Sequence, residues 1–201
     1  ALELARKKVQ DEGAISSLER IEQEALRLDE LIDEVLMLTK LRALHRPREQ
    51  VEVDLSTLIG EVVSDAHFEA ESMDKAVEAH VTKACKVFGS RELLRRALEN
   101  VVRNGVKYTK EKSAVTVALE ASNNEAIITV KDQGKGVDEE LLPRLFTPFF
   151  RAAPDRDRET GGVGLGLAIT EGAVELHGGS VSAENAEGGG FVVTLKLPIE
   201  S

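Results

Sequence analysis

Apolar residues recur at alternating steps of three and four between about Ala14 and Leu44. Steps of this length return to the same side of a helix, so the pattern predicts one long helix with a single apolar stripe. The stripe consists of Leu18, Ile21, Ala25, Leu28, Ile32 and Val35. Charged residues fill the other faces. Such a stripe needs a partner, which favours a symmetric four-helix bundle of two chains over an isolated helical hairpin.

The chain on either side of this helix carries weaker signals. Residues 1–10 resemble the end of another helix whose beginning is absent, which predicts that the sequence is part of something longer. Gly13 predicts a turn between the two helices. The proline-containing stretch from His45 to Gln50 predicts a break and a linker. The predicted organisation is therefore 1–44 for the end of a helical hairpin, 45–53 for a linker and 54–201 for a second domain.

The second domain alternates between strand and helix patterns, which predicts an α+β fold. A period of two indicates strands and a period near 3.6 indicates helices. The strands are expected at 51–53, 115–119, 126–130, 180–183 and 191–197, and the helices at 54–73, at 90–108 and after Gly166.

Composition narrows the class of protein. Apolar residues make up 42% and charged residues 31% of the 201 residues, which is typical of a globular chain. The formal net charge of -10 argues against nucleic acid as the main partner. The single cysteine, Cys85, cannot form an intrachain disulfide and is expected to be a packed or surface thiol rather than a nucleophile. No apolar run approaches the ~18 residues that span a membrane.

Three constellations carry candidate chemistry. On the helix at 90–108, Asn100 and Asn104 lie one turn apart and Lys107 joins their face. Amides in this position suit a hydrated magnesium ion and phosphate oxygens. Just after a strand, Asp132 to Gly136 combines a carboxylate with alternate glycines, which let a flat ligand approach the backbone closely. The carboxylate can accept a hydrogen bond from an exocyclic amine.

The third constellation is the glycine-rich run from Gly161 to Gly166, which opens an apolar helix. Exposed N–H groups at a helix N-terminus bind phosphate. A dinucleotide fingerprint would need a preceding strand, and the charged stretch from Ala152 to Thr160 does not have the composition of one. A P-loop is excluded because no Gly-Lys-Ser/Thr sequence follows the glycines. The stretch at 152–161 instead predicts a mobile lid.

Half of the six phenylalanines lie between Leu145 and Arg151, ahead of the lid. They predict an apolar plug beneath a loop, and Arg151 is placed to meet a phosphate. In order and spacing, these segments resemble the boxes of histidine-kinase ATP-binding domains. Asn100–Asn104 matches the N box, Asp132–Gly136 the first glycine box, Phe146–Phe149 the F box, and Gly162–Gly166 the second glycine box. The segment from Gly188 to Phe191 resembles the last and weakest box.

The resemblance covers about residues 54–198, and residues 1–44 resemble the dimerisation and phosphotransfer hairpin. Leu18–Leu28 and Phe68–Glu71 look most like the Cpx-type envelope-stress sensor kinases. The family implies a two-layer α/β sandwich, the Bergerat ATP-binding fold, with a mixed sheet under three helices. It also implies ATP and Mg²⁺ as cofactors. One departure is Gly105, where the family usually has alanine.

Carried over residue by residue, the resemblance assigns the adenine amine to Asp132 and magnesium to Asn104, with Asn100 beside it. Lys107 and Arg151 would contact phosphates, and Tyr108 would pack near the adenine. The complete predicted ATP site is Asn100, Asn104, Lys107, Tyr108, Asp132, Gly134, Gly136, Arg151, Gly162, Gly164, Leu165 and Gly166.

Related ATPases remain as alternatives. Type II topoisomerases, Hsp90 and mismatch-repair proteins share this fold and place a water-activating glutamate four residues before the magnesium asparagine. This chain has Asn100 there, and Glu99 is expected to face elsewhere. Anti-sigma serine kinases share the boxes without a preceding hairpin. A non-catalytic docking module with a vestigial ATP site is a third alternative.

The predicted function is phosphoryl transfer from ATP to a histidine upstream of this sequence, for relay to a response-regulator aspartate. Residues 1–10 contain no histidine, and His45, His67, His80 and His177 lie elsewhere. The expected partners are a second copy through residues 14–44 and a receiver domain, with no nucleic acid. The resemblance implies the cytoplasmic portion of a bacterial inner-membrane protein, which would meet the membrane only through upstream segments.

Overall fold

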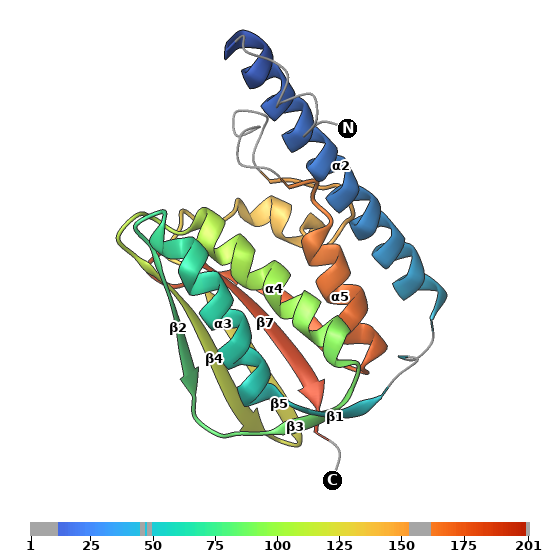
Figure 1. The fold of residues 1–201 in the computed structure, drawn as a ribbon. Helices are drawn as coiled ribbons and strands as arrows, with labels where there is room; N and C mark the ends of the chain where they lie inside the picture. The colour runs from blue at the N-terminus through green and yellow to red at the C-terminus, as the bar shows by residue number, and fades with distance from the viewer. Residues whose placement is uncertain (1–11, 45–46, 48–49, 153–161, 200–201) are drawn as a thin grey trace. The chain divides into compact units, whose positions relative to one another are not determined.

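The computed structural model describes residues 12–44, 47, 50–152 and 162–199 (Figure 1). The chain divides into two compact units, Ala1–Met37 and Leu38–Ser201, and each is described by itself. The helix expected over residues 1–10, the linker residue His45 and most of the lid expected at 152–161 lie outside the described residues.

The first unit is the greater part of helix α2 (Glu12–Ala43). The long helix predicted from the apolar stripe is confirmed, but the turn predicted at Gly13 is wrong, because Gly13 lies inside α2. Glycine costs a helix only about 1 kcal/mol relative to alanine, which a long helix tolerates near its end. Three stripe residues, Ile21, Leu28 and Ile32, are each more than half exposed.

The second unit contains the remaining elements. They are β1 (Val51–Asp54), α3 (Leu55–Glu71), β2 (Ala76–Val81), β3 (Lys86–Gly89), α4 (Arg91–Tyr108), β4 (Ala114–Ser122), β5 (Glu125–Lys131), the 3-10 helix η1 (Glu139–Arg144), α5 (Gly166–Leu176), β6 (Ser180–Asn185) and β7 (Phe191–Pro198). Among the described helices, none has the length and apolar character needed to cross a bilayer.

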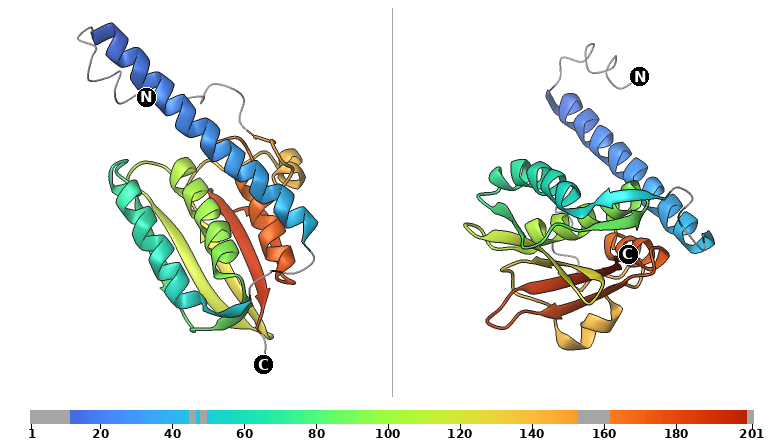
Figure 2. Two further views of the ribbon diagram at one scale, coloured as in Figure 1. Left: turned by 45° about the vertical axis from the view of Figure 1, so that its right-hand side comes forward. Right: turned by 90° about the horizontal axis from the view of Figure 1, so that it is seen from below.

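Five strands form one mixed sheet in the order β2-β4-β5-β7-β6, and β1 pairs antiparallel with β3 in a small second sheet. β2 runs parallel to β4, while the other neighbours are antiparallel. Helices α3, α4 and α5 lie side by side on one face of the large sheet (Figures 1 and 2). The two-layer sandwich with a mixed sheet under three helices is therefore confirmed.

The core lies between the helices and the sheet. Along β4 every second residue is buried, so Val115, Val117 and Leu119 face the helices. Helix α4 contributes an apolar stripe of Leu94, Ala97, Leu98, Val101, Val102 and Val106. Both α3 and α4 begin at a side-chain cap, with Asp54 accepting from the Thr57 N–H and Ser90 from the Leu93 N–H. These caps explain why the predicted starts of both helices were nearly right.

The sequence pattern missed two strands, β2 and β3. β2 is an edge strand in which only Val77 is buried, so it lacks the alternation that marks a half-buried strand. β3 has four residues, too few for a period to stand out. The departure at Gly105 has a packing reason, because a Cβ there would lie 2.9 Å from Cγ1 of Val115. In this chain valine occupies the space that an alanine would need.

Candidate functional site

Helix α4 carries two half-buried asparagines next to its apolar stripe. The amide nitrogen of Asn100 donates to the carbonyl oxygen of Gly166, at 3.2 Å. Among the described residues the side chain of Asn104 makes no hydrogen bond, so its amide is available to a ligand. The two residues are one turn apart on one helix, as the sequence predicted.

The described part of the glycine-rich run, residues 162–166, lies against this face of α4. A Cβ on Gly162 would lie 3.3 Å from Nζ of Lys107, and a Cβ on Gly166 would lie 3.4 Å from Cγ of Asn100. Two segments that are more than 50 residues apart in the sequence thus meet. The segment predicted to bind phosphate and the helix predicted to bind magnesium therefore lie next to each other.

The loop needs glycine at two of its positions. Gly162 and Gly164 have φ angles of 133° and 82°, in the left-handed region that L side chains rarely adopt. A Cβ on Gly164 would also come within 2.6 Å of the carbonyl oxygen of Phe150. Leu165 also belongs to the loop, but its side chain is completely buried. Only its backbone can face a ligand at the start of α5.

The phenylalanine segment, residues 145–151, packs against the glycine-rich loop. The N–H of Phe149 donates to the carbonyl oxygen of Gly164, at 2.9 Å. The predicted plug is only partly correct, because Leu145 is buried but Phe149 is 59% exposed. Phe149 also has a φ of 66°, in the left-handed region. Arg151 follows, half-buried, and makes no hydrogen bond or ion pair with the residues that the structure describes.

Asp132 lies at the end of β5 and is only 5% exposed. Its Oδ1 accepts two backbone hydrogen bonds, from Gly134 N at 2.7 Å and from Phe191 N at 3.2 Å. Its Oδ2 accepts none from the described residues, which leaves one carboxylate oxygen for a ligand. Burial raises the pKa of Asp132 above its usual value, and the two N–H groups offset part of that effect.

The last glycine segment was the weakest sequence signal, and it packs directly on Asp132. A Cβ on Gly190 would lie 2.2 Å from the carbonyl oxygen of Asp132, so no larger residue fits. The neighbouring Phe191 also accepts the backbone N–H of Asp132, at 3.0 Å. The start of β7 therefore holds the carboxylate of Asp132, which the sequence predicted as a ligand-binding group, in place.

The first glycine box rests on two further contacts. A Cβ on Gly134 would lie 2.5 Å from the carbonyl oxygen of Tyr108, the last residue of α4. Gly136 has φ of 73°, and a Cβ there would meet Oδ1 of Asn185. The side chain of Asn185 accepts from and donates to the backbone of Val137, at 2.8 and 2.7 Å. Sequence reasoning missed Asn185, because a lone asparagine at a strand end carries no distinctive pattern.

Tyr108 is half exposed, and Nζ of Lys107 lies 5.2 Å from the centre of its ring. This distance is within the range of a cation–π contact. The aromatic ring and the cation at the end of α4 are thus adjacent. They lie one helical turn after Asn104. On their other side is the loop that carries Asp132.

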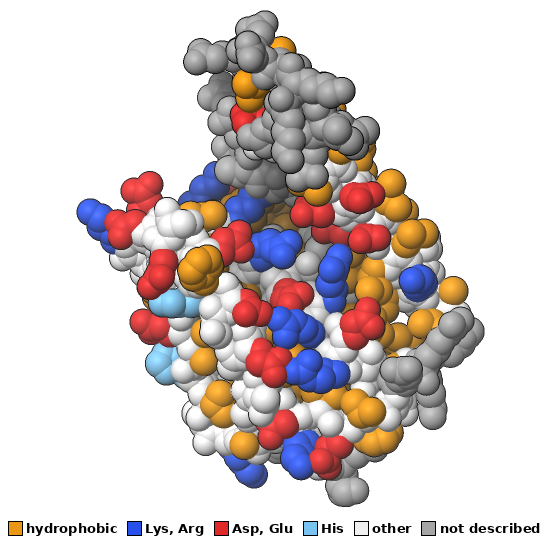
Figure 3. All heavy atoms as spheres, in the orientation of Figure 1, with side chains coloured by type: hydrophobic (Ala, Val, Ile, Leu, Met, Phe, Trp, Pro, Cys, Tyr) orange, Lys and Arg blue, Asp and Glu red, His pale blue; other side chains and the backbone are white. Residues whose placement is uncertain are grey.

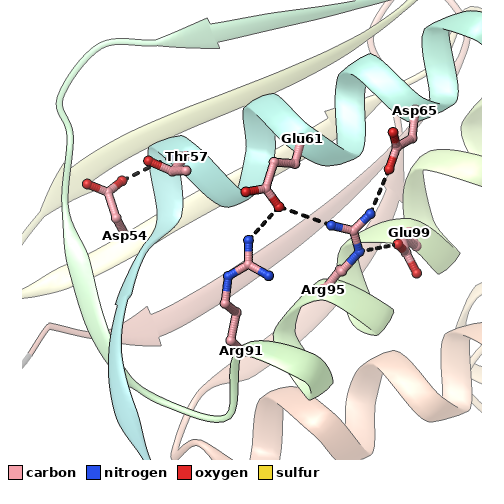
Figure 4. A network of polar contacts seen from close by, with 7 residues as sticks. All are labelled: Asp54, Thr57, Glu61, Asp65, Arg91, Arg95 and Glu99. Atoms are coloured by element: carbon pink, nitrogen blue, oxygen red, sulfur yellow. Dashed lines mark hydrogen bonds and ion pairs between the residues drawn. The ribbon is translucent and has the colours of Figure 1, made fainter.

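Glu99 does not face this site. Its Oε1 accepts from Nε of Arg95, at 2.7 Å, and Arg95 also pairs with Glu61 and Asp65 of α3 (Figure 4). The carboxylate is therefore part of an ion network between α3 and α4. This confirms the expectation that Glu99 faces elsewhere and leaves the position four residues before Asn104 without a carboxylate.

Comparison with known proteins agrees with this arrangement. Residues 89–201, more than half of the chain, match the family described as "Histidine kinase-, DNA gyrase B-, and HSP90-like ATPase". The chain is 38% identical over 188 residues to the sensor histidine kinase CpxA of Escherichia coli strain K12. The match covers 93% of this chain and 40% of that protein. The chain thus spans well under half the length of this relative.

Solved structures lead to the same family. The mycobacterial sensor histidine kinase MprB is 28% identical and superposes with a TM-score of 0.66, covering 76% of this chain and 99% of that one. Full-length ShkA in complex with AMPPNP, at 24% identity, shares the fold with a TM-score of 0.80 over 96% of this chain and 40% of that one. The chain belongs to the histidine kinase-, DNA gyrase B- and HSP90-like ATPase family and, within it, to the sensor histidine kinases, whose catalytic domain it carries.

Proposed function

We propose that this chain binds Mg²⁺–ATP between α4 and the start of α5 and transfers the γ-phosphate to a histidine of a sensor kinase. The observation that carries the proposal is the approach of Gly162 and Gly166 to Lys107 and Asn100. It brings a cation, amides and a glycine-lined helix N-terminus to one spot. These are the groups that hold a polyphosphate in proteins.

At the other end of the site, Asp132 recognises the base. Its free Oδ2 accepts a hydrogen bond from the exocyclic amine of adenine, while Oδ1 stays bound to backbone N–H groups. Gly134 and Gly136 keep the backbone open beside the flat ring. Tyr108 packs near the adenine, and Lys107 and Arg151 contact phosphates.

The donor set fits magnesium bound together with ATP. Among the described residues no cluster of three or more His, Cys, Asp or Glu side chains could hold a metal ion alone. Magnesium often keeps several waters and shares substrate phosphates rather than using an all-protein cage. Amide oxygens of Asn104 and Asn100 are suitable ligands for such an ion. Bound there, the ion would neutralise charge on the phosphates.

The missing carboxylate at position 100 favours transfer to a side chain over attack by water. Asn100 cannot accept a proton from water, and Glu99 is held by Arg95. A positioned nucleophile is then needed, because phosphoryl transfer depends on near in-line placement of the attacking atom. A histidine presented by a helical bundle would supply that nucleophile.

The chain's described histidines do not suit this role. His177 uses both ring nitrogens, toward Ala173 and Ser90. His67 accepts from the N–H of Val77. His80 lies on the edge strand β2, which is not part of the site. We therefore propose an acceptor outside these residues, from which a response-regulator receiver domain takes the phosphoryl group.

The test is incubation with γ-labelled ATP. The chain alone is expected to acquire no acid-labile label, whereas a longer sensor-kinase chain that pairs with it and carries the acceptor histidine is labelled. Label on this chain alone, at the rate of an intact kinase, would show that the acceptor is one of its own histidines.

We further propose that α2 pairs with a second copy through its apolar stripe. Ile21, Leu28 and Ile32 expose more than half of their surface, although each would bury it in a bundle. Sedimentation at rising concentration tests this with two variants. Leu28→Glu is expected to prevent association, whereas Leu26→Glu, equally exposed but off the stripe, leaves it intact. Equal association of both variants would remove the stripe as the interface.

Two alternatives make different predictions. A docking module with a vestigial site would not bind nucleotide at all, which a direct titration detects. A water-activating ATPase of the same fold would release phosphate steadily without an acceptor. The site lies on the cytoplasmic side of the membrane in this proposal, where ATP is available, as part of a protein of the bacterial inner membrane.

A further inference from the structure

The residue that caps the C-terminus of α4 carries a buried hydroxyl that the proposed chemistry does not use. Thr109 is only 4% exposed, and its own N–H donates to the carbonyl oxygen of Gly105, at 2.8 Å, to end the helix. A buried hydroxyl costs free energy unless it is hydrogen-bonded. The partners of the Thr109 side chain therefore indicate why a polar residue stands there.

The partners form a directed chain of hydrogen bonds. Oγ of Ser113 donates to the carbonyl oxygen of Lys110, at 2.5 Å, which uses its only proton. The contact of 2.7 Å between Thr109 and Ser113 must then have Thr109 as donor. The oxygen of Thr109 is left as an acceptor, and it receives the backbone N–H of Gln133, at 3.1 Å.

Gln133 is the residue after Asp132. Its N–H is thus held by Thr109 while the next N–H, of Gly134, is held by Oδ1 of Asp132. Gly134 also packs on the carbonyl group of Tyr108, so closely that a Cβ would lie 2.5 Å from the oxygen. The turn that carries Asp132 is therefore fixed to the end of α4 at two adjacent residues, Tyr108 and Thr109.

We propose that Thr109 is a positioning residue for recognition of the nucleotide base. Its hydroxyl holds the backbone of Gln133 and so aims the free Oδ2 of Asp132 at the exocyclic amine. The inference rests on the proposed function, in which Asp132 accepts that amine. Thr109 itself does not touch the nucleotide. Because α4 also carries Asn100, Asn104 and Lys107, the hydroxyl sets the distance between the base end and the phosphate end of the site.

The experiment compares two substitutions of matched size. Thr109→Val keeps the shape and removes the hydroxyl, whereas Thr109→Ser keeps the hydroxyl and removes a methyl group. Each variant of the 201-residue chain is titrated with Mg²⁺–ATP and with purine riboside triphosphate, which lacks the exocyclic amine. The ratio of the two affinities reports recognition of the amine alone. General loss of structure would weaken both nucleotides equally.

The unmodified chain is expected to prefer ATP by tenfold or more, since a hydrogen bond to a charged group is worth roughly that factor. Thr109→Val is expected to lose most of this preference while still binding both nucleotides through their phosphates, and Thr109→Ser to keep it. If Thr109→Val keeps the full preference while Asp132→Ala loses it, Thr109 has no positioning role. If Asp132→Ala also keeps the preference, the base assignment itself fails and the inference fails with it.

Discussion

Helix α4 has two polar faces that differ in how their side chains are used. On the face toward α3, Arg91 and Arg95 pair with three acidic side chains (Figure 4), and all five are at least partly exposed. Figure 3 shows basic and acidic side chains interspersed on this side of the molecule. Toward α5, the side-chain hydrogen bonds that join the two helices run from neutral groups to backbone. Asn100 donates to Gly166, and the buried Thr170 hydroxyl lies 3.2 Å from the carbonyl oxygen of Ala97.

The difference separates stabilising charges from binding groups. The charges toward α3 satisfy one another, so they offer nothing to a ligand. Toward α5, Asn104 and one oxygen of Asp132 have no partner among the described residues although both lie in a partly buried site. Polar groups in a partly buried site usually have a hydrogen-bond partner, which here would be the ligand. We therefore expect substitutions on the two faces to have opposite signatures, with loss of binding on one and loss of stability on the other.

The largest effect is expected from Asn104→Ala. Removing the amide removes the proposed magnesium ligand, so affinity for ATP in the presence of Mg²⁺ should fall tenfold or more, the range for a hydrogen bond or ligand to a charged group. Thermal unfolding should change little, because Asn104 makes no hydrogen bond within the described structure. Arg103→Ala, next to it on the exposed side of the helix, is the control. Equal affinity of the two variants would contradict the assignment.

A smaller effect is expected from protonation of His177, which links α5 to the start of α4. Its Nε2 accepts the N–H of Ser90 and its Nδ1 donates to the carbonyl oxygen of Ala173, so the ring must be neutral. Burial lowers the pKa of His177 below its usual 6.5. The contact therefore stabilises the fold fully above 6.5, and this stabilisation is lost as the pH falls through the folded-state pKa.

The measurement is the free energy of unfolding of the chain and of His177→Gln, at about pH 7.5 and about pH 5.5. Glutamine can still accept a hydrogen bond but does not titrate. The stability difference between the two proteins should therefore shrink at the lower pH. His80→Gln, at a histidine of β2 whose side chain is 61% exposed, is the control variant. A difference that stays constant with pH would mean that His177 is not the titrating group.

The smallest effect is expected from Arg95→Ala, on the face toward α3. The variant breaks three ion pairs and leaves Glu61, Asp65 and Glu99 close together. Exposed pairs contribute little each, so the loss should be about 1 kcal/mol of unfolding free energy and smaller at high salt. Nucleotide affinity should not change. A large loss of affinity would mean that this face takes part in binding.

Periodicity was enough to predict α2, α3, α4 and the central strands, because their apolar residues repeat over many positions. It failed for β2 and β3, which bury too few side chains to leave a pattern. The candidate site was predictable where a motif is local, as at Asp132 and Gly164. The residues that support the site were not predictable, because Thr109 and Asn185 act through contacts between segments that lie far apart in the sequence. Such contacts have no spacing that a sequence could reveal.

Whether Asp132 holds the nucleotide base is tested most directly by titrating the chain with a fluorescent ATP analogue, beside Asp132→Ala and Arg95→Ala. We expect one site per chain, affinity reduced on the order of tenfold to a hundredfold in Asp132→Ala, and unchanged affinity in Arg95→Ala. Equal binding by the chain and by Asp132→Ala would contradict this assignment, because the buried carboxylate would then have no role in holding the base.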